Sequence, residues 1–216
     1  MELIIGNKNY SSWSLRAWLC LAAFEVPFRE TKLNLFTPEF YTRLEAHTPA
    51  AKVPVLIDNG VTVWDSLAIC EYLNETCLQG RGWPEDPSER ARARSVAAEM
   101  HSGYAALRNE MPMNCRAKRR VDLSEAALRD VAAIDQLWCD LLQRDSGAPW
   151  LFGEFSIADI FFAPVALRFE TYAPELSAPA AAYMQRLLAL PAMQQWVEDA
   201  LQEEEWVEED EAGQPL

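Results

Sequence analysis

The sequence is poor in the residues that metal sites and catalytic triads require. Its two histidines, His47 and His101, have no ligand-like spacing. No G-x-S-x-G elbow accompanies them, so we do not expect a Ser-His-Asp hydrolase. The five cysteines are odd in number and form no C-x-x-C pair, which argues against a zinc site or a disulfide framework. We therefore expect no metal and a reducing, cytoplasmic location.

Long apolar runs are also missing. No stretch approaches the roughly 18 consecutive apolar residues of a membrane-spanning helix. The first six residues lack a basic region followed by a long apolar region, so they predict a first strand rather than a signal peptide. The sequence thus offers no reason to expect a membrane partner.

Basic residues are fewer than acidic ones, and the excess of acidic residues is concentrated at one end of the sequence. The net charge is −14, and residues 198–216 contain nine acidic side chains and no Lys or Arg, so residues 1–197 carry only −5. An acidic protein repels phosphate backbones, which disfavours nucleic acid and anionic membranes as partners. We expect residues 206–216 to form an acidic tail that frays into disorder, with a docking tail as the alternative.

What remains is an ordinary globular composition. The chain has 216 residues, of which 50% are hydrophobic and 24% charged, enough to bury a sizeable core. The first eighty residues alternate between strand and helix patterns, and Asn59-Gly60 marks a hairpin turn. The expected strands are Leu3–Gly6, Phe28–Leu33, Val55–Asp58 and Val61–Trp64, and the expected helices are Ser14–Phe24, a short one from Thr37-Pro38-Glu39, and Ser66 to about Glu75.

Beyond this unit every segment is predicted to be helical. Residues 80–86 are a linker by composition, and Asp86-Pro87-Ser88-Glu89 then opens a long helix that ends near Pro112. Later helices are expected at 122–144, after the capping box Ser156–Asp159, at 178–189 and at 191–204. The fold class is therefore α/β plus all-α, with a βαβαββα domain over 1–79 and an all-helical domain over 87–205.

Hydroxyl groups crowd the turn before the first helix. Ser11, Ser12 and Ser14 lie where unpaired backbone N–H groups and the helix dipole stabilise an anion. A serine hydroxyl there donates a further hydrogen bond to such an anion. One of the three serines can be a simple N-cap, but capping does not need all three.

Two further segments predict a binding site for an extended, amino-acid-like ligand. In Lys52-Val53-Pro54, a cis bond before the proline would turn the backbone N–H and C=O of Val53 outward. Asp65 and Ser66 begin the next helix, where a hydroxyl and a backbone N–H can hold a carboxylate while Asp65 holds an ammonium group. Helix capping explains the second pair equally well.

These three segments, followed by a helical domain, resemble the cytosolic glutathione transferase family over the chain to about residue 205. The matching motifs are Ser-Ser-x-Ser-x-Arg at 11–16, Val53-Pro54, Asp65–Ile69 and Ser156–Asp159. Within the family, the serine-type zeta class (maleylacetoacetate isomerases) is most similar. Asp65 departs from that class, which usually has Gln there, and Arg168 falls four residues after Pro164 rather than seven.

The resemblance implies a thioredoxin-like first domain that binds glutathione as co-substrate, and a homodimer. Ser12 or Ser11 would activate the glutathione thiol, while Lys52, Val53, Pro54, Asp65 and Ser66 would bind the rest of the tripeptide. An electrophile pocket between the domains would involve Tyr10, Trp13, Tyr104, Arg108 and Met111, although Met100, Tyr104, Leu107 and Met111 equally suit core or interface. His101 is expected to be a satisfied polar residue, with a catalytic base as the alternative. Arg168 is expected to be an internal ion-pair partner, with steering of an anionic substrate as the alternative. The alternative function is a non-catalytic interaction or glutathione-carrier protein on the same fold.

Overall fold

The first part of the chain forms a four-stranded sheet in the order β2-β1-β3-β4. The computed structural model describes residues 1–144 and 147–216. Strand β1 (Glu2–Ile5) pairs in parallel with β2 (Arg29–Lys32) and antiparallel with β3 (Val55–Asp58), which continues through the predicted hairpin into β4 (Val61–Trp64). Both hairpin strands have the bounds that the sequence predicts.

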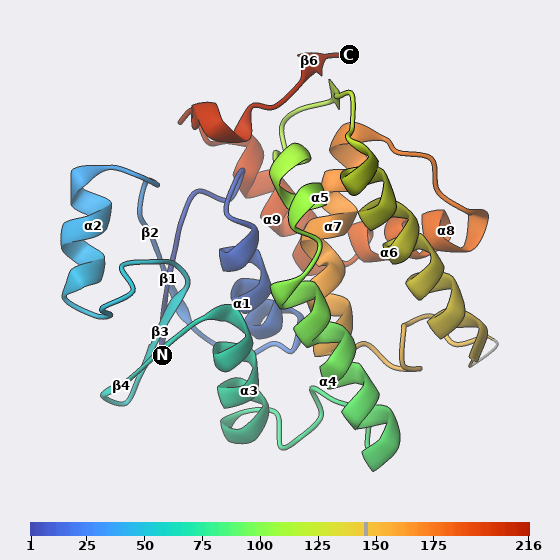
Figure 1. The fold of residues 1–216 in the computed structure, drawn as a ribbon. Coiled ribbons are helices and arrows are strands. Elements are labelled where there is room, and N and C mark those ends of the chain that lie inside the picture. Colours follow the sequence, from blue (N-terminus) through green and yellow to red (C-terminus); the bar gives the residue numbers. More distant parts are fainter. Residues whose placement is uncertain (145–146) are drawn as a thin grey trace.

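Helices cover both faces of this sheet (Figure 1). On one face α1 (Ser12–Ala23) and α3 (Ser66–Thr76) pack on Leu3, Ile5 and Leu56. On the other, α2 (Pro38–Glu45) buries Phe40 and Leu44 against Ile4 and Val55. The alternation of Leu3, Ile4 and Ile5 between the two faces follows from the two-residue period of a strand.

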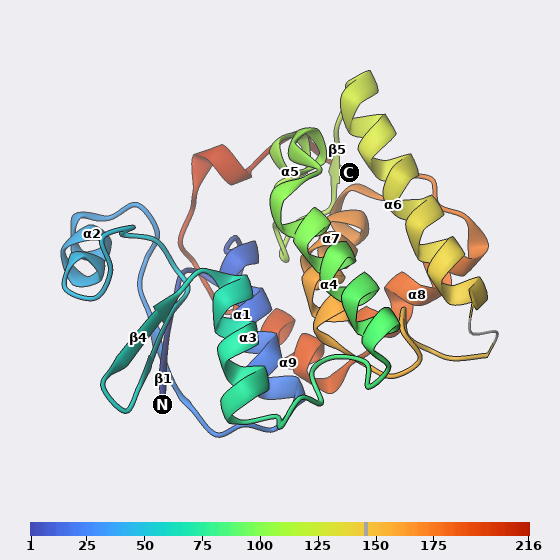
Figure 2. The ribbon, with the colours of Figure 1, turned by 60° about the horizontal axis from the view of Figure 1, so that its bottom comes forward.

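The second part of the chain is helical, and Figure 2 shows its helices gathered beside α1 and α3. Its centre is α7 (Ile157–Tyr172), which is buried along nearly its whole length and packs on α1 and α4. Around it lie α4 (Pro87–Ser102), α5 (Ala105–Glu110), α6 (Glu125–Arg144), α8 (Ala178–Leu188) and α9 (Pro191–Leu201). This arrangement confirms the predicted fold class.

Two helix predictions need correction. Helix α1 begins at Ser12 rather than Ser14, with Ser11 as its N-cap. The single long helix predicted from Pro87 to Pro112 is wrong, because the chain breaks after Ser102 and restarts at Ala105. Gly103 is extended and Tyr104 has a φ of 54°, so neither residue continues the helix.

The acidic C-terminus is ordered rather than disordered. Residues 208–210 form a 3₁₀ turn, η1, and β6 (Gln214–Pro215) pairs antiparallel with β5 (Arg119–Arg120). In both views the red C-terminal segment runs beside α5 (Figures 1 and 2). The expectation of a frayed tail is thus wrong, because composition does not reveal a docking partner a hundred residues away.

Within the described residues, no helix is both long and apolar enough to cross a bilayer. The same residues contain no group of three or more His, Cys, Asp or Glu side chains placed to hold a metal ion.

Candidate functional site

A cleft of about 580 Å³ lies at the start of α1, between the sheet and the helical part of the chain. A second cavity of about 520 Å³ adjoins it and shares Trp13, Lys52, Val53 and Arg108 with it. Of the predicted site residues, the two cavities bring together Tyr10, Ser11, Ser12, Trp13, Lys52, Val53, Pro54, Asp65, Ser66 and Arg108. Three segments that are far apart in the sequence therefore line one continuous cleft.

The two adjacent serines have different hydrogen-bond partners. The Ser11 hydroxyl donates to Ser14 Oγ at 2.7 Å and accepts from the Ser14 N–H, as an N-cap does. The Ser12 Oγ accepts from Nη2 of Arg168 at 3.2 Å. No hydrogen bond donated by Ser12 Oγ is found among the described residues, so its proton is free for a ligand in the cleft.

Two guanidinium groups, of Arg16 and Arg168, bond to Ser12, and that of Arg108 lines the cleft beside Trp13. Arg168 also donates to the carbonyl oxygens of Arg108 and Met111, and Arg16 donates to the carbonyl oxygens of Ser12 and Phe161. No carboxylate lies within ion-pairing distance of Arg16, Arg108 or Arg168 in the part of the chain described. The expected internal ion pair of Arg168 is thus replaced by bonds to neutral oxygens.

The charges of these arginines are costly to bury. Burial, followed by the neighbouring Arg168 and Arg108, lowers the pKa of Arg16 to about 9. Burial also lowers the pKa of Arg168 to about 10, against the attraction of Asp210. Both groups remain cationic at neutral pH, so the cluster produces a positive potential at Ser12 that favours an anion.

The middle of the cleft offers an unpaired stretch of backbone. The Val53–Pro54 peptide bond is cis, which is the geometry that turns the Val53 backbone outward. Within the described chain, neither the N–H nor the C=O of Val53 has a hydrogen-bond partner. An extended peptide-like ligand can therefore pair with Val53 as an added strand does.

The far end of the cleft is built around Asp65 and Ser66. Asp65 Oδ1 accepts from the N–H groups of Leu67 and Ala68 as the N-cap of α3, while Oδ2 lies 3.2 Å from Nε2 of His101. The buried Ser66 Oγ has no hydrogen-bond partner among the described residues. The predicted pair of residues thus lines the cleft, but Asp65 already has partners on both oxygens.

The predicted electrophile pocket is only partly assembled. Tyr10, Trp13 and Arg108 line the cleft, and Arg108 lies 5.4 Å from the centre of the Trp13 ring. Met111 is fully buried in the core, and the Tyr104 hydroxyl donates to Glu99 instead of lining the cleft. The helix break at Gly103 removes the shared face on which both residues were predicted to lie.

Several cleft residues could not be found from sequence motifs. Phe36, Tyr41, Met113 and Asp210 line the cleft, but none belongs to a recognisable motif. Asp210 lies about two hundred residues from Ser12 in sequence, so only the folded chain brings them together.

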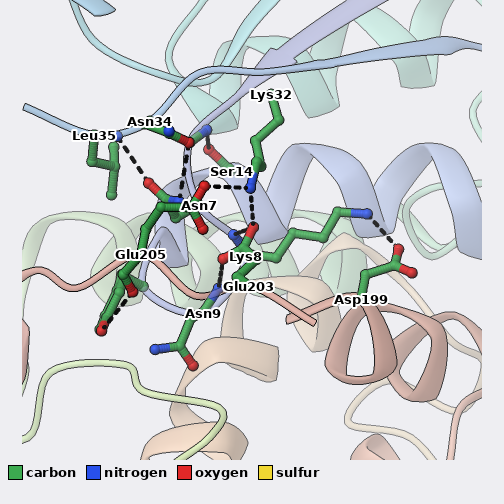
Figure 3. Close-up of polar contacts among 12 residues, drawn as sticks. Asn7, Lys8, Asn9, Ser14, Lys32, Asn34, Leu35, Asp199, Glu203 and Glu205 are labelled. Carbon is green, nitrogen blue, oxygen red and sulfur yellow. Dashed lines mark hydrogen bonds and ion pairs between the residues drawn. The ribbon is translucent and has the colours of Figure 1, made fainter. Parts of the chain in front are cut away.

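The C-terminal segment also holds the loop that precedes α1 (Figure 3). The buried Glu203 carboxylate accepts from the N–H of Lys8 at 2.8 Å and from that of Asn9 at 3.0 Å. Lys8 Nζ binds Asp199 at 2.6 Å, and Lys32 Nζ lies 3.3 Å from Glu203. These contacts fix residues 7–10, and hence the start of α1, against the end of the chain.

Comparison with known proteins identifies the family. The model of the glutathione S-transferase N-terminal domain matches residues 10–76, and that of the C-terminal domain matches residues 89–199. The chain belongs to the glutathione S-transferase family.

Relatives of known name agree with the zeta-class resemblance. The chain is 30% identical to the maleylacetoacetate isomerase of Mus musculus over 88% of this chain and 90% of that one. Among solved structures, a glutathione transferase homologue from Burkholderia with bound glutathione superposes with a TM-score of 0.73 at 24% identity, covering 92% of this chain and 97% of that one. A maleyl pyruvate isomerase described as a bacterial zeta-class glutathione S-transferase gives a TM-score of 0.72 at 21% identity, covering 95% and 100%. The prediction of a zeta-like member of the glutathione S-transferase family is confirmed.

Proposed function

We propose that the protein is a glutathione transferase in which Ser12 activates the glutathione thiol for attack on a small electrophile. Glutathione lies extended along the cleft, with its cysteine amide paired to the free backbone of Val53. Its γ-glutamyl head lies at the end formed by Asp65 and Ser66, next to Lys52. The electrophile enters beside Tyr10, Trp13 and Arg108.

The observation that carries this proposal is the hydrogen bonding of the two serines. Ser11 Oγ donates its proton within the protein, whereas Ser12 Oγ accepts from a buried arginine and keeps its proton for the cleft. A hydroxyl polarised in this way donates a charge-assisted hydrogen bond to a thiolate. The thiolate is the nucleophile and Ser12 the residue that stabilises it.

The energetic requirement is modest. Lowering the pKa of a thiol from about 8.5 by about two units takes about 2.7 kcal/mol of preferential stabilisation of the thiolate. A charge-assisted hydrogen bond contributes about 1.5–3 kcal/mol, and the arginines behind Ser12 add a positive potential. Once formed, the thiolate conjugates, isomerises or reduces the electrophile; the zeta-class relatives favour isomerisation as one of these reactions.

Ultraviolet titration of bound glutathione against pH tests this proposal. The thiolate absorption should appear well below pH 8.5 in the wild-type protein. Ser12→Ala should raise the pKa of the bound thiol by about one to two units, because it removes the donor to the sulfur. Ser11→Ala should leave that pKa nearly unchanged while destabilising α1 through loss of its cap.

The outcomes separate the alternatives. Binding with an unshifted thiol in the wild-type protein would make it a glutathione carrier. Absence of binding at millimolar glutathione would contradict an enzyme altogether and favour an interaction protein. A raised thiol pKa in Ser11→Ala instead of Ser12→Ala would exchange the roles of the two serines.

We also propose a cytoplasmic homodimer. All five cysteines are free, as expected in a reducing compartment. Val61 and Trp64 are 48% and 44% exposed on β4, which lies next to α3, and such a surface suits an interface between two copies. Sedimentation equilibrium at micromolar concentration should give about twice the chain mass, and a monomeric mass would contradict the dimer.

A further inference from the structure

The last eleven residues form a strap, defined here as residues 206–216, that lies beyond both matched family domains. Its end is tied to β5 through the β5–β6 pairing and a hydrogen bond from the Leu216 N–H to the Lys118 carbonyl at 3.1 Å. Its middle is tied by Glu211, which accepts from the Tyr10 hydroxyl at 2.7 Å and pairs with Arg119. The strap is therefore docked at several points.

The sequence is adapted to this docking. Gly213 has a φ of +80°, and a Cβ placed there would collide with the carbonyl oxygen of Arg120. Only glycine allows the strap to approach β5 so closely without strain. Four basic side chains also lie in the segment that receives the acidic strap, at Arg116, Lys118, Arg119 and Arg120. The contact is thus complementary in shape, and Arg119 pairs with Glu211 across it.

Between these anchors the strap brings Asp210 into the cleft. Asp210 lines it together with Tyr10, Ser12, Arg108 and Arg168. Burial raises the pKa of Asp210 to about 6, as do Glu209 and Glu211, while Arg168 opposes this. A half-buried carboxyl of this kind is still mostly ionised at neutral pH. It adds a negative charge to the part of the cleft where Tyr10 and Arg108 would meet the electrophile.

We propose that Asp210 is a specificity-determining residue that weakens the preference of the cleft for anionic electrophiles. Its carboxylate offsets the positive potential of Arg168 and repels a second carboxylate at the same place. An uncharged electrophile meets no such repulsion, so the strap leaves its reaction almost unaffected. This inference rests on the proposed function, since it concerns the electrophile side of the same cleft.

Competing rates for a chlorodinitrobenzoate and its methyl ester test the inference on the full chain. In both reactions the glutathione thiolate forms a C–S bond to the ring carbon, and chloride leaves with the C–Cl electron pair. Asp210→Asn should raise the acid-to-ester ratio of kcat/KM by about 5- to 10-fold. Glu211→Ala, which releases the strap from Tyr10 and Arg119, should raise it similarly.

Glu208→Gln is the matched control, because this substitution removes one negative charge from the same strap. Glu208 accepts a hydrogen bond from the Trp206 indole and does not line the cleft. The ratio in this variant should equal that of the wild-type protein. An Asp210→Asn ratio no higher than that of Glu208→Gln would overturn the inference.

Binding of unreactive nitrobenzoate, followed by quenching of tryptophan fluorescence, provides a second readout that needs no turnover. Asp210→Asn should tighten this binding by about 5- to 10-fold relative to Glu208→Gln, and equal affinities would overturn the inference. Failure of the wild-type protein to conjugate either electrophile would contradict the proposed function alone, since the binding comparison is independent of catalysis.

Discussion

At the scale of single residues, Ser12 and Arg168 form the unit on which the proposed chemistry depends. The guanidinium occupies an acceptor site of the hydroxyl, which orients the remaining proton away from Arg168. Arg168 lies behind the hydroxyl that would meet the thiol, so it acts through Ser12 as a positioning residue.

This dependence predicts a non-additive effect. Arg168→Met should raise the pKa of the bound thiol and lower kcat/KM by about tenfold, equivalent to about 1.4 kcal/mol. In a Ser12→Ala background the same substitution should raise that pKa by less, because only the positive potential of Arg168 remains to be lost. Arg168→Lys should recover part of the loss, since it keeps the charge but not the fork of donors.

Arg129→Met provides the control for this double-mutant cycle, because Arg129 is an exposed arginine that lies on α6 and pairs only with Glu125 among the described residues. If Arg168→Met raised the thiol pKa equally in the wild-type and Ser12→Ala backgrounds, Arg168 would act independently of the serine.

The choice between the two serines also marks the limit of sequence reasoning at this scale. The pattern at 11–16 predicts an anion-binding turn but does not distinguish the Ser11 hydroxyl from the Ser12 hydroxyl. Arg168 lies 156 residues beyond Ser12 in the sequence. Its contact arises only from the packing of α7 against α1, which no local pattern encodes.

At the scale of elements, the capping box of α7 connects several parts of the helical domain. Asp159 is fully buried, and its carboxylate accepts from Ser156 N and Oγ, from the Leu151 N–H and from the Tyr183 hydroxyl. The helix start, the preceding loop and α8 are thereby joined at one side chain.

Removing this carboxylate should be far more costly than removing an exposed cap. Asp159→Ala leaves several buried donors without a partner, so it should lower the free energy of unfolding by about 3–5 kcal/mol. Asp86→Ala, which removes the exposed cap of α4, should cost about 1 kcal/mol. Urea denaturation of both variants measures the difference, and equal losses would contradict a linking role for Asp159.

Elements with strong local signals were predicted closely. The Asn59-Gly60 turn fixes the hairpin. The N-caps Thr37, Asp86 and Ser156 mark the starts of α2, α4 and α7, and a proline follows the first two. The break at Gly103 escaped prediction because the apolar spacing of Met100, Leu107 and Met111 continues across it. Periodicity predicts which side chains are buried, but not whether one helix or two carry them.

At the scale of the whole molecule, the order of the two domains and the positions of the three cleft segments could be predicted from the sequence. The role of the C-terminus could not. Its acidity suggested solvation, whereas its charges pair with Lys8, Lys32 and Arg119 on the rest of the chain. The complementary charges are dispersed over the sequence and meet only in the folded protein.

The Glu203 contacts have a consequence for the timing of synthesis. The ribosome makes the chain from its N-terminus, and the first domain can begin to fold while later residues are still being added. In the loop at 7–10, however, the N–H groups of Lys8 and Asn9 donate to the Glu203 carboxylate, and the Tyr10 hydroxyl donates to Glu211. Because Glu203 and Glu211 are synthesised near the end of the chain, the first domain can fold before the loop that precedes α1 gains these contacts.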